Sequence, residues 1–128
     1  MREEERLKNM YKIKIKTDFS AAHNLRDYHG KCERLHGHNW IVEARFLYQV
    51  LGKDGMAIDF KEAKKLVNEA IEKLDHAYLN EVDEFKDINP TSENVAKFIY
   101  DSVKKNNKNL KSISVWENAD SCATYSEN

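Results

Sequence analysis

Three histidines and one cysteine lie close together in the N-terminal part of this sequence. His23 stands upstream of the run C-E-R-L-H-G-H-N-W, which contains Cys32, His36 and His38. Residues i and i+2 share a face in an extended segment, so His36 and His38 point the same way, and His23 can join them from a neighbouring strand. Three neutral imidazoles around a divalent metal leave a fourth position open for chemistry, as in catalytic zinc sites. The spacing therefore predicts a zinc site formed by His23, His36 and His38.

Other side chains of this sequence could do acid–base or nucleophilic work beside such a metal. Cys32 lies in a polar run, where its thiolate could act as a nucleophile, a base or a fourth ligand. The alternative of a small buried hydrophobe fits Cys122 better. Asp75 and His76 fall near the predicted end of a helix, where the macrodipole and the adjacent carboxylate favour an imidazolium. Short motifs of this kind are common in polar turns, so the prediction depends on their combination.

Glu117 is a carboxylate projected onto the apolar side of a strand. It has the parity of the apolar residues in a strand predicted around Ile113, and a buried carboxylate needs a partner. The N–H groups of a ligand would serve as that partner. Thr91, Ser92 and Glu93 at a helix start offer further backbone donors and hydroxyls for a heterocycle.

Two long strands are predicted to carry the histidines. Residues 11–19 alternate between apolar and charged side chains, and a pleat that continues without a bulge puts His23 on the apolar face. A second strand, predicted over 38–50, has Trp40 on the same face as His36 and His38. The metal site is therefore expected at one end of the inner face of an antiparallel pair.

Two helices and two further strands complete the predicted order ββααββ. Asp59 begins a helix as an N-cap, and its apolar stripe starts at Phe60 and continues to Leu74. Thr91 is the predicted N-cap of the second helix, directly after the only proline. A third strand around 113–115 and a short last strand ending near Tyr125 follow.

Length and composition limit the class of protein. The 128 residues predict one domain over 11–128, preceded by a charged extension over 1–10, and a chain this small favours a site shared between subunits. Charged residues make up 34% and the net charge is −1, which argues against a nucleic-acid or membrane-surface partner. Without an apolar run of about 20 residues or a secretory signal, we expect a cytoplasmic protein with reduced cysteines.

Several motifs together resemble one known enzyme family, the 6-pyruvoyltetrahydropterin and 6-carboxytetrahydropterin synthases. They span nearly the whole chain after residue 10 in the order of that family. The motifs are F-S-A-A-H at 19–23, C-x-x-x-H-G-H-N-W at 32–40, D-F at 59–60, L-D-H-x-x-L-N at 74–80, P-T-S-E-N at 90–94 and W-E at 116–117.

This resemblance implies an α+β tunnelling fold, with an antiparallel sheet, two helices on one face, and sheets that close into a barrel in a homohexamer of two trimers. By similarity the zinc ligands are His23, His36 and His38, the catalytic residues are Cys32, Asp75 and His76, and the pterin-binding residues are Thr91, Ser92, Glu93 and Glu117. The implied substrate is the pterin triphosphate 7,8-dihydroneopterin triphosphate, bound at subunit interfaces.

The compact C-x-x-x-H spacing from Cys32 to His36 resembles the carboxy branch of the family. That branch forms 6-carboxy-5,6,7,8-tetrahydropterin with release of acetaldehyde and triphosphate, in the biosynthesis of queuosine and other 7-deazapurines. The alternatives are triphosphate elimination to a pyruvoyl product, a different three-histidine hydrolase, and a non-catalytic module that binds metal or pterin. No role is assigned to His29, and Arg26, Lys31 and Arg34 are only nearby candidates for holding the triphosphate.

Overall fold

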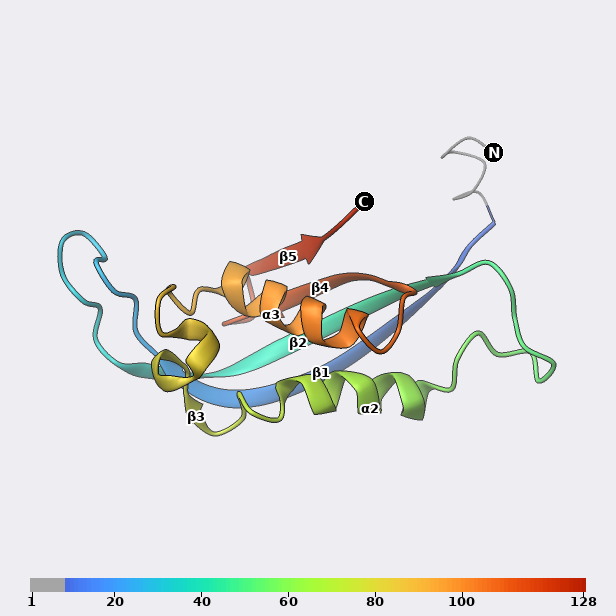
Figure 1. The fold of residues 1–128 in the computed structure, drawn as a ribbon, viewed down its shortest axis with the longest axis horizontal. Coiled ribbons are helices and arrows are strands. Elements are labelled where there is room, and N and C mark those ends of the chain that lie inside the picture. Colours follow the sequence, from blue (N-terminus) through green and yellow to red (C-terminus); the bar gives the residue numbers. More distant parts are fainter. Residues whose placement is uncertain (1–8) are drawn as a thin grey trace.

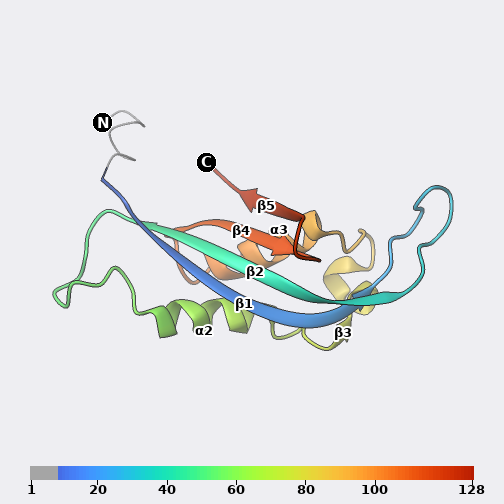
Figure 2. The ribbon, with the colours of Figure 1, turned by 180° about the vertical axis from the view of Figure 1, so that it is seen from behind.

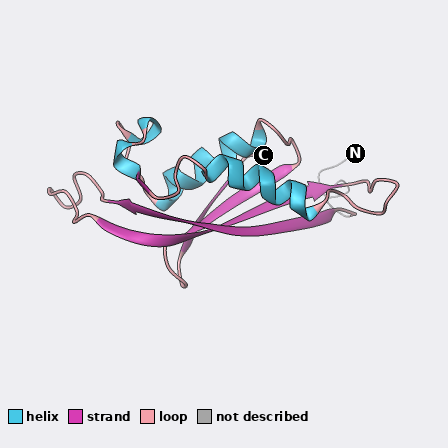
Figure 3. Ribbon diagram, turned by 90° about the horizontal axis from the view of Figure 1, so that it is seen from below, coloured by secondary structure: helices cyan, strands magenta, loops and turns pink. Residues whose placement is uncertain are grey.

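The computed structural model describes residues 9–128, so nearly all of the charged extension predicted for 1–10 lies outside the described residues. Five strands form one sheet in the order β3-β1-β2-β4-β5, and two helices cover one of its faces (Figures 1 and 3). The opposite face carries no helix of the described chain (Figure 2). The strands are β1 (Tyr11–His23), β2 (His36–Tyr48), β3 (Ala77–Tyr78), β4 (Leu110–Trp116) and β5 (Cys122–Ser126).

The long β1–β2 hairpin is the element that carries the three histidines. Its antiparallel register runs without a break from Tyr11 opposite Tyr48 to His23 opposite His36. The predicted pleat therefore holds to the end of β1, and β2 begins two residues earlier than the predicted residue 38. Trp40 is fully buried at this end and donates its indole N–H to the Ala21 carbonyl at 3.1 Å. This bond ties the two strands together beside the histidines.

Both helices begin at the predicted N-caps. The Asp59 carboxylate accepts from the backbone N–H of Lys61 at the start of α2 (Phe60–Ile71). The Thr91 hydroxyl accepts from the N–H of Asn94 at the start of α3 (Ser92–Lys104). Helix α2 packs on β1, and α3 packs on β4 and β5, so their apolar faces close the core over the sheet.

The structure corrects the sequence prediction at several places in the fold. The predicted order ββααββ gains the two-residue strand β3, which pairs in parallel with β1 and is followed by the short 3-10 helices η1 (Leu79–Glu81) and η2 (Asp83–Phe85). Phe60 was expected in the buried stripe of α2, but as the first residue of the helix it is 64% exposed. Glu43 lies on the face of β2 opposite Trp40 and is nevertheless buried, with Lys16 and Arg45 paired to its carboxylate.

No described helix has the length and apolar character needed to cross a membrane.

Candidate metal centre and active site

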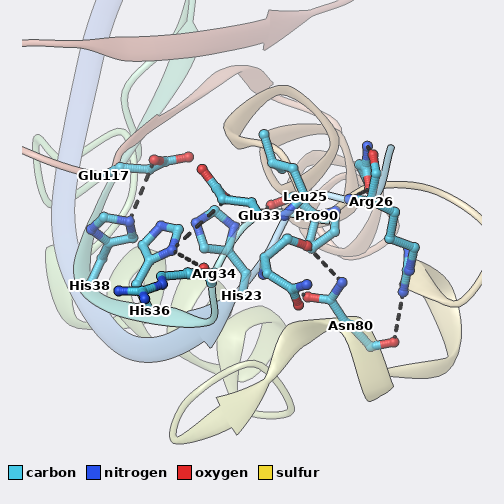
Figure 4. A network of polar contacts seen from close by, with 12 residues as sticks. His23, Leu25, Arg26, Glu33, Arg34, His36, His38, Asn80, Pro90 and Glu117 are labelled. Carbon is cyan, nitrogen blue, oxygen red and sulfur yellow. Dashed lines mark hydrogen bonds and ion pairs between the residues drawn. The ribbon is translucent and has the colours of Figure 1, made fainter. Parts of the chain in front are cut away.

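The three predicted ligands meet at one end of the hairpin, on the face that the helices cover (Figure 4). His23 is buried at the end of β1, and His36 and His38 begin β2 directly beside it. One nitrogen from each imidazole lies within 4.8 Å of the others, and among the described residues these three histidines alone form such a cluster. The structure thus brings together the three ligands that strand parity predicted.

The hydrogen bonds of the rings leave nitrogens free for a metal. His23 donates from Nδ1 to the carbonyl of Pro90 at 2.8 Å, and His36 donates from Nδ1 to the carbonyl of Arg34 at 2.8 Å. A carbonyl only accepts, so Nδ1 is the donor in both rings, and Nε2 is the nitrogen left to bind a metal. The Nε2 atoms of His23 and His38 are buried without a hydrogen-bond partner, which is costly unless a ligand satisfies them. The donor set therefore fits a divalent metal such as zinc.

His38 has an electrostatic setting that suits a ligand. Burial lowers the pKa of His38, and Glu117, with Oε2 3.6 Å from Nε2, opposes that shift. The net direction favours neutral imidazole, which is the form that binds a metal. Glu117 therefore lies next to the candidate metal centre, close to one of its three imidazoles.

A small cavity adjoins the metal centre at the start of α3. Ser92 donates its hydroxyl to Oε1 of Glu117 at 2.7 Å, and both residues line a cavity of about 230 Å³ together with Glu93. Cys122 also lines this cavity and is exposed, so the sequence argument for a buried Cys122 is wrong. Thr91 does not line it, because its hydroxyl caps the helix. Three of the four predicted pterin-binding residues are thus brought together.

Cys32 is an exposed residue of the loop 24–35 and is not part of the imidazole cluster. Sequence reasoning overlooked its neighbour Glu33, whose carboxylate accepts from the N–H of Leu25 at 3.1 Å and lies 3.9 Å from Nδ1 of His36. The signal was present in the sequence, since an acidic residue stands between the candidate thiol and a ligand.

Of the other charged residues near the loop, Arg26 is already engaged by protein. Its guanidinium donates to the carbonyls of Ile88 and Asn80, whereas Lys31 and Arg34 are exposed. His29 is also exposed, with a positive φ of 52°.

Asp75 and His76 form a pair, but on the other side of the sheet. Asp75 accepts from the N–H of Ser20 at 3.0 Å and lies 3.0 Å from Nδ1 of His76. The Ser20 N–H, assisted by His76, lowers the pKa of the Asp75 carboxyl. His76 has a positive φ of 59° and lines an open cavity of about 610 Å³ with Ser20, Gly37 and Asn39. Ser20 and Asn39 alternate along their strands with the residues that face the helices, so this cavity opens mainly on the helix-free face.

Comparison with known proteins identifies the family that this fold and site define. The sequence profile described as 6-pyruvoyl tetrahydropterin synthase matches residues 12–128, and the chain belongs to that family. The solved structure of 6-pyruvoyl tetrahydropterin synthase from Caenorhabditis elegans superposes with a TM-score of 0.81 at 24% identity, covering 93% of this chain and 96% of that one. The five-stranded sheet with two helices is therefore the fold of this family.

Curated relatives cover most of the chain. A protein of Archaeoglobus fulgidus named "Putative 6-carboxy-5,6,7,8-tetrahydropterin synthase" is 40% identical over 87% of this chain and 91% of its own. The 6-carboxy-5,6,7,8-tetrahydropterin synthase of Haemophilus influenzae is 28% identical over 92% of this chain and all of its own. The dihydroneopterin monophosphate aldolase of Pyrococcus furiosus is 34% identical over 83% of this chain and 89% of its own.

Proposed function

We propose that this chain is a zinc-dependent lyase that converts 7,8-dihydroneopterin triphosphate into 6-carboxy-5,6,7,8-tetrahydropterin, acetaldehyde and triphosphate. The observation that carries the proposal is the three-histidine cluster, with His23 buried, next to the cavity of Glu117 and Ser92. The C-x-x-x-H spacing and the names of the relatives from Archaeoglobus and Haemophilus support the carboxy branch over the pyruvoyl one.

The cavity beside the metal centre has the chemistry to hold the pterin ring. The ring presents several N–H groups along one edge, and the Glu117 carboxylate accepts hydrogen bonds while Ser92 already orients it. Glu93 lines the same cavity at the first turn of α3. Thr91 supports the ring indirectly by fixing the start of that helix.

In this proposal the chain's own side chains carry out the proton transfers of the reaction. When bound, the metal supplies Lewis-acid polarisation of the substrate's side-chain oxygens. Cys32, as thiolate, removes the acidified C–H proton, and the Asp75–His76 pair carries protons to and from those oxygens. The ordering of His76 by Asp75, which accepts from Ser20 at the same time, suits this exchange.

The position of the Asp75–His76 pair supports a shared active site. The pair lies on the helix-free face, where His38 is the only member of the imidazole cluster that also lines its cavity, and the imidazole nitrogens meet on the helix-covered face. We therefore infer that the two halves reach one substrate from different chains. A homohexamer of two trimers, whose sheets close into barrels, would place the pair of one subunit beside Cys32 of the next. Symmetric assembly makes such a donation reciprocal, so every subunit gives and receives one pair.

A second candidate activity is aldol cleavage of a dihydroneopterin phosphate. The relative named as an aldolase supports it, and so does Glu33, a carboxylate 3.9 Å from a metal-ligand imidazole that could serve as the base in place of Cys32. Glu33→Gln keeps an oxygen that accepts from the Leu25 N–H and removes the charge, so it tests the base without removing that bond. An aldolase would lose activity in this variant and keep it in Cys32→Ala.

The deciding experiment incubates zinc-loaded protein with 7,8-dihydroneopterin triphosphate and identifies the pterin product by mass, with a parallel acetaldehyde assay. We expect carboxytetrahydropterin and acetaldehyde. A pyruvoyl product without acetaldehyde would move the function to the other branch, and a hydroxymethyl-pterin would favour the aldolase. If no pterin product forms, thermal stabilisation by a pterin would leave a binding module as the function.

A further inference from the structure

Two asparagine side chains hold the short segment that follows the first metal ligand. Asn80 accepts from the N–H of Asn24 at 3.0 Å and donates to the carbonyl of the same residue at 2.8 Å. Asn89 does the same at Arg26, accepting at 2.7 Å and donating at 3.0 Å. Residues 24 and 26 thus receive from two side-chain amides the pair of hydrogen bonds that a neighbouring strand would otherwise give them. We call Asn80 and Asn89 the asparagine pair.

The residue between these two is held from its opposite side. Leu25 donates to the Glu33 carboxylate at 3.1 Å and accepts from the Glu33 backbone N–H at 2.8 Å. Every backbone polar group of residues 24–26 therefore has a partner, although the segment belongs to no strand. Glu33 follows Cys32 directly, so the loop carrying the candidate base is attached to the same segment (Figure 4).

The asparagine pair is also connected to the imidazole of His23. The carbonyl that accepts from Nδ1 of His23 belongs to Pro90, the residue next to Asn89. The backbone carbonyl of Asn89 is itself fixed by the side chain of Asn94 at 2.8 Å. Asn80 is buried, and the Arg26 guanidinium donates to its carbonyl at 3.0 Å. Displacement of Asn89 would move the neighbouring carbonyl that orients the His23 ring, and displacement of Asn80 would move the backbone of Asn24, the residue that follows His23.

We propose that Asn80 and Asn89 are positioning residues for the metal centre, which lock residues 24–26 and thereby fix both the His23 imidazole and the loop of Cys32. The inference rests on the metal-dependent function proposed above. Neither asparagine touches the metal position or the cavity of Glu117. Their effect passes through hydrogen bonds that orient a ligand, and such outer contacts typically change metal affinity by about 10- to 100-fold.

The test measures zinc and cobalt affinity of metal-free protein by competition with a chelator, together with the visible spectrum of the cobalt form. Asn80→Ala and Asn89→Ala should each weaken metal binding by about tenfold and alter the cobalt spectrum. Asn89→Asp, which keeps the acceptor for the Arg26 N–H but loses the donor, should fall between wild type and Asn89→Ala.

Asn109→Ala is the matched control, because Asn109 also donates to a backbone carbonyl, that of Leu47, at the far end of the hairpin. It should leave affinity and spectrum unchanged, and thermal unfolding of the metal-free proteins shows that each variant is folded. If Asn89→Ala does not fold, the Asn89→Asp variant tests the role of Asn89 in its place.

Wild-type affinity and an unchanged spectrum in the folded variants of the pair would overturn this inference alone. Failure of the wild-type protein to bind either metal would overturn the proposed function as well.

Discussion

The two faces of the β1–β2 hairpin carry different halves of the proposed chemistry. On the face covered by helices, backbone carbonyls hold the His23 and His36 rings, and His38 stands beside them against the buried Trp40. On the other face, His76 stands at the edge of an open cavity with its side chain 81% exposed. One face holds the candidate ligand set, and the other holds the candidate proton-transfer pair beside an open cavity.

This difference follows from the two-residue period of a strand. His36 and His38 share one face, and Gly37 and Asn39 between and after them belong to the other. A short motif of this kind can therefore serve two sites at once, one through its histidines and one through its glycine. On the proposed function, the active site is complete only in the assembly and not in the single chain.

The largest expected effect comes from removing a ligand on the helix-covered face. His36→Ala should weaken zinc binding by more than about 100-fold, since a lost ligand costs more than a lost outer contact. Metal content after dialysis, read by mass spectrometry, measures it. His29→Ala is the matched control, because His29 is an exposed loop histidine and should leave the metal content unchanged. Normal zinc content in His36→Ala would remove this face from the metal centre.

The next effect tests whether the two faces of different subunits work together. Cys32→Ala and His76→Ala should each abolish turnover while retaining zinc. Chains of the two variants, unfolded and reassembled in equal amounts, should recover activity at about one quarter of the sites, because each site takes its thiol and its imidazole from different chains. Steady-state assays of the mixture measure the recovery. No recovery in a correctly assembled mixture would mean that both groups come from one chain.

A smaller effect is expected on the helix-free face at Gly37. A methyl group there meets only the Ala21 carbonyl at 3.8 Å, which is ordinary contact, and Gly37 has no positive φ. Gly37→Ala should therefore keep the melting temperature and zinc content of the wild type. Turnover should nevertheless fall by about tenfold or more if a neighbouring subunit approaches this surface, because small misplacements of catalytic groups are costly. Unchanged kcat and KM would show that nothing approaches Gly37 closely.

The smallest effect concerns the pH dependence of stability at Asp75. Its pKa is lowered in the folded state from the usual 3.8, chiefly by the Ser20 N–H, so the charged carboxylate stabilises the fold above that value. This contribution is lost as pH falls through the folded-state pKa. Asp75→Asn keeps an acceptor for Ser20 and removes the charge. Its deficit in unfolding free energy, measured with denaturant, should be present at neutral pH and shrink in acid. The size is limited because the side chain is 43% exposed and screened by water.

The sequence alone predicts those features of the fold that a local rule determines, such as strand parity and helix N-caps. The parity of His23 and His38 could be predicted because the pleat has a fixed period and β1 contains no bulge. The helix starts at Asp59 and Thr91 could be predicted because capping depends on one side chain and the next few N–H groups. Together these rules place the metal ligands and the start of α3 beside Glu117.

The parts that sequence reasoning missed depend on contacts between distant segments. Strand β3 has two residues and hence no period, and it exists because the segment after α2 pairs with β1. The asparagine pair contacts residues more than 50 positions away, so neither motif nor spacing indicates it. The placement of His76 on the helix-free face likewise follows from the tie between Asp75 and Ser20, which no local pattern encodes.

The backbone of His76 has a consequence for how this sequence changes over time. Its φ of 59° lies in the left-handed region, which costs a residue with a Cβ about 1–2 kcal/mol and a glycine almost nothing. Selection for stability alone would therefore favour glycine or asparagine here, and on the proposed function the need for the imidazole opposes that replacement. A descendant that had abandoned the chemistry should lose His76 early, while its buried Trp40 and Phe19 persisted. On the proposed function, the residue at this position would therefore help to distinguish inactive members of the family by sequence.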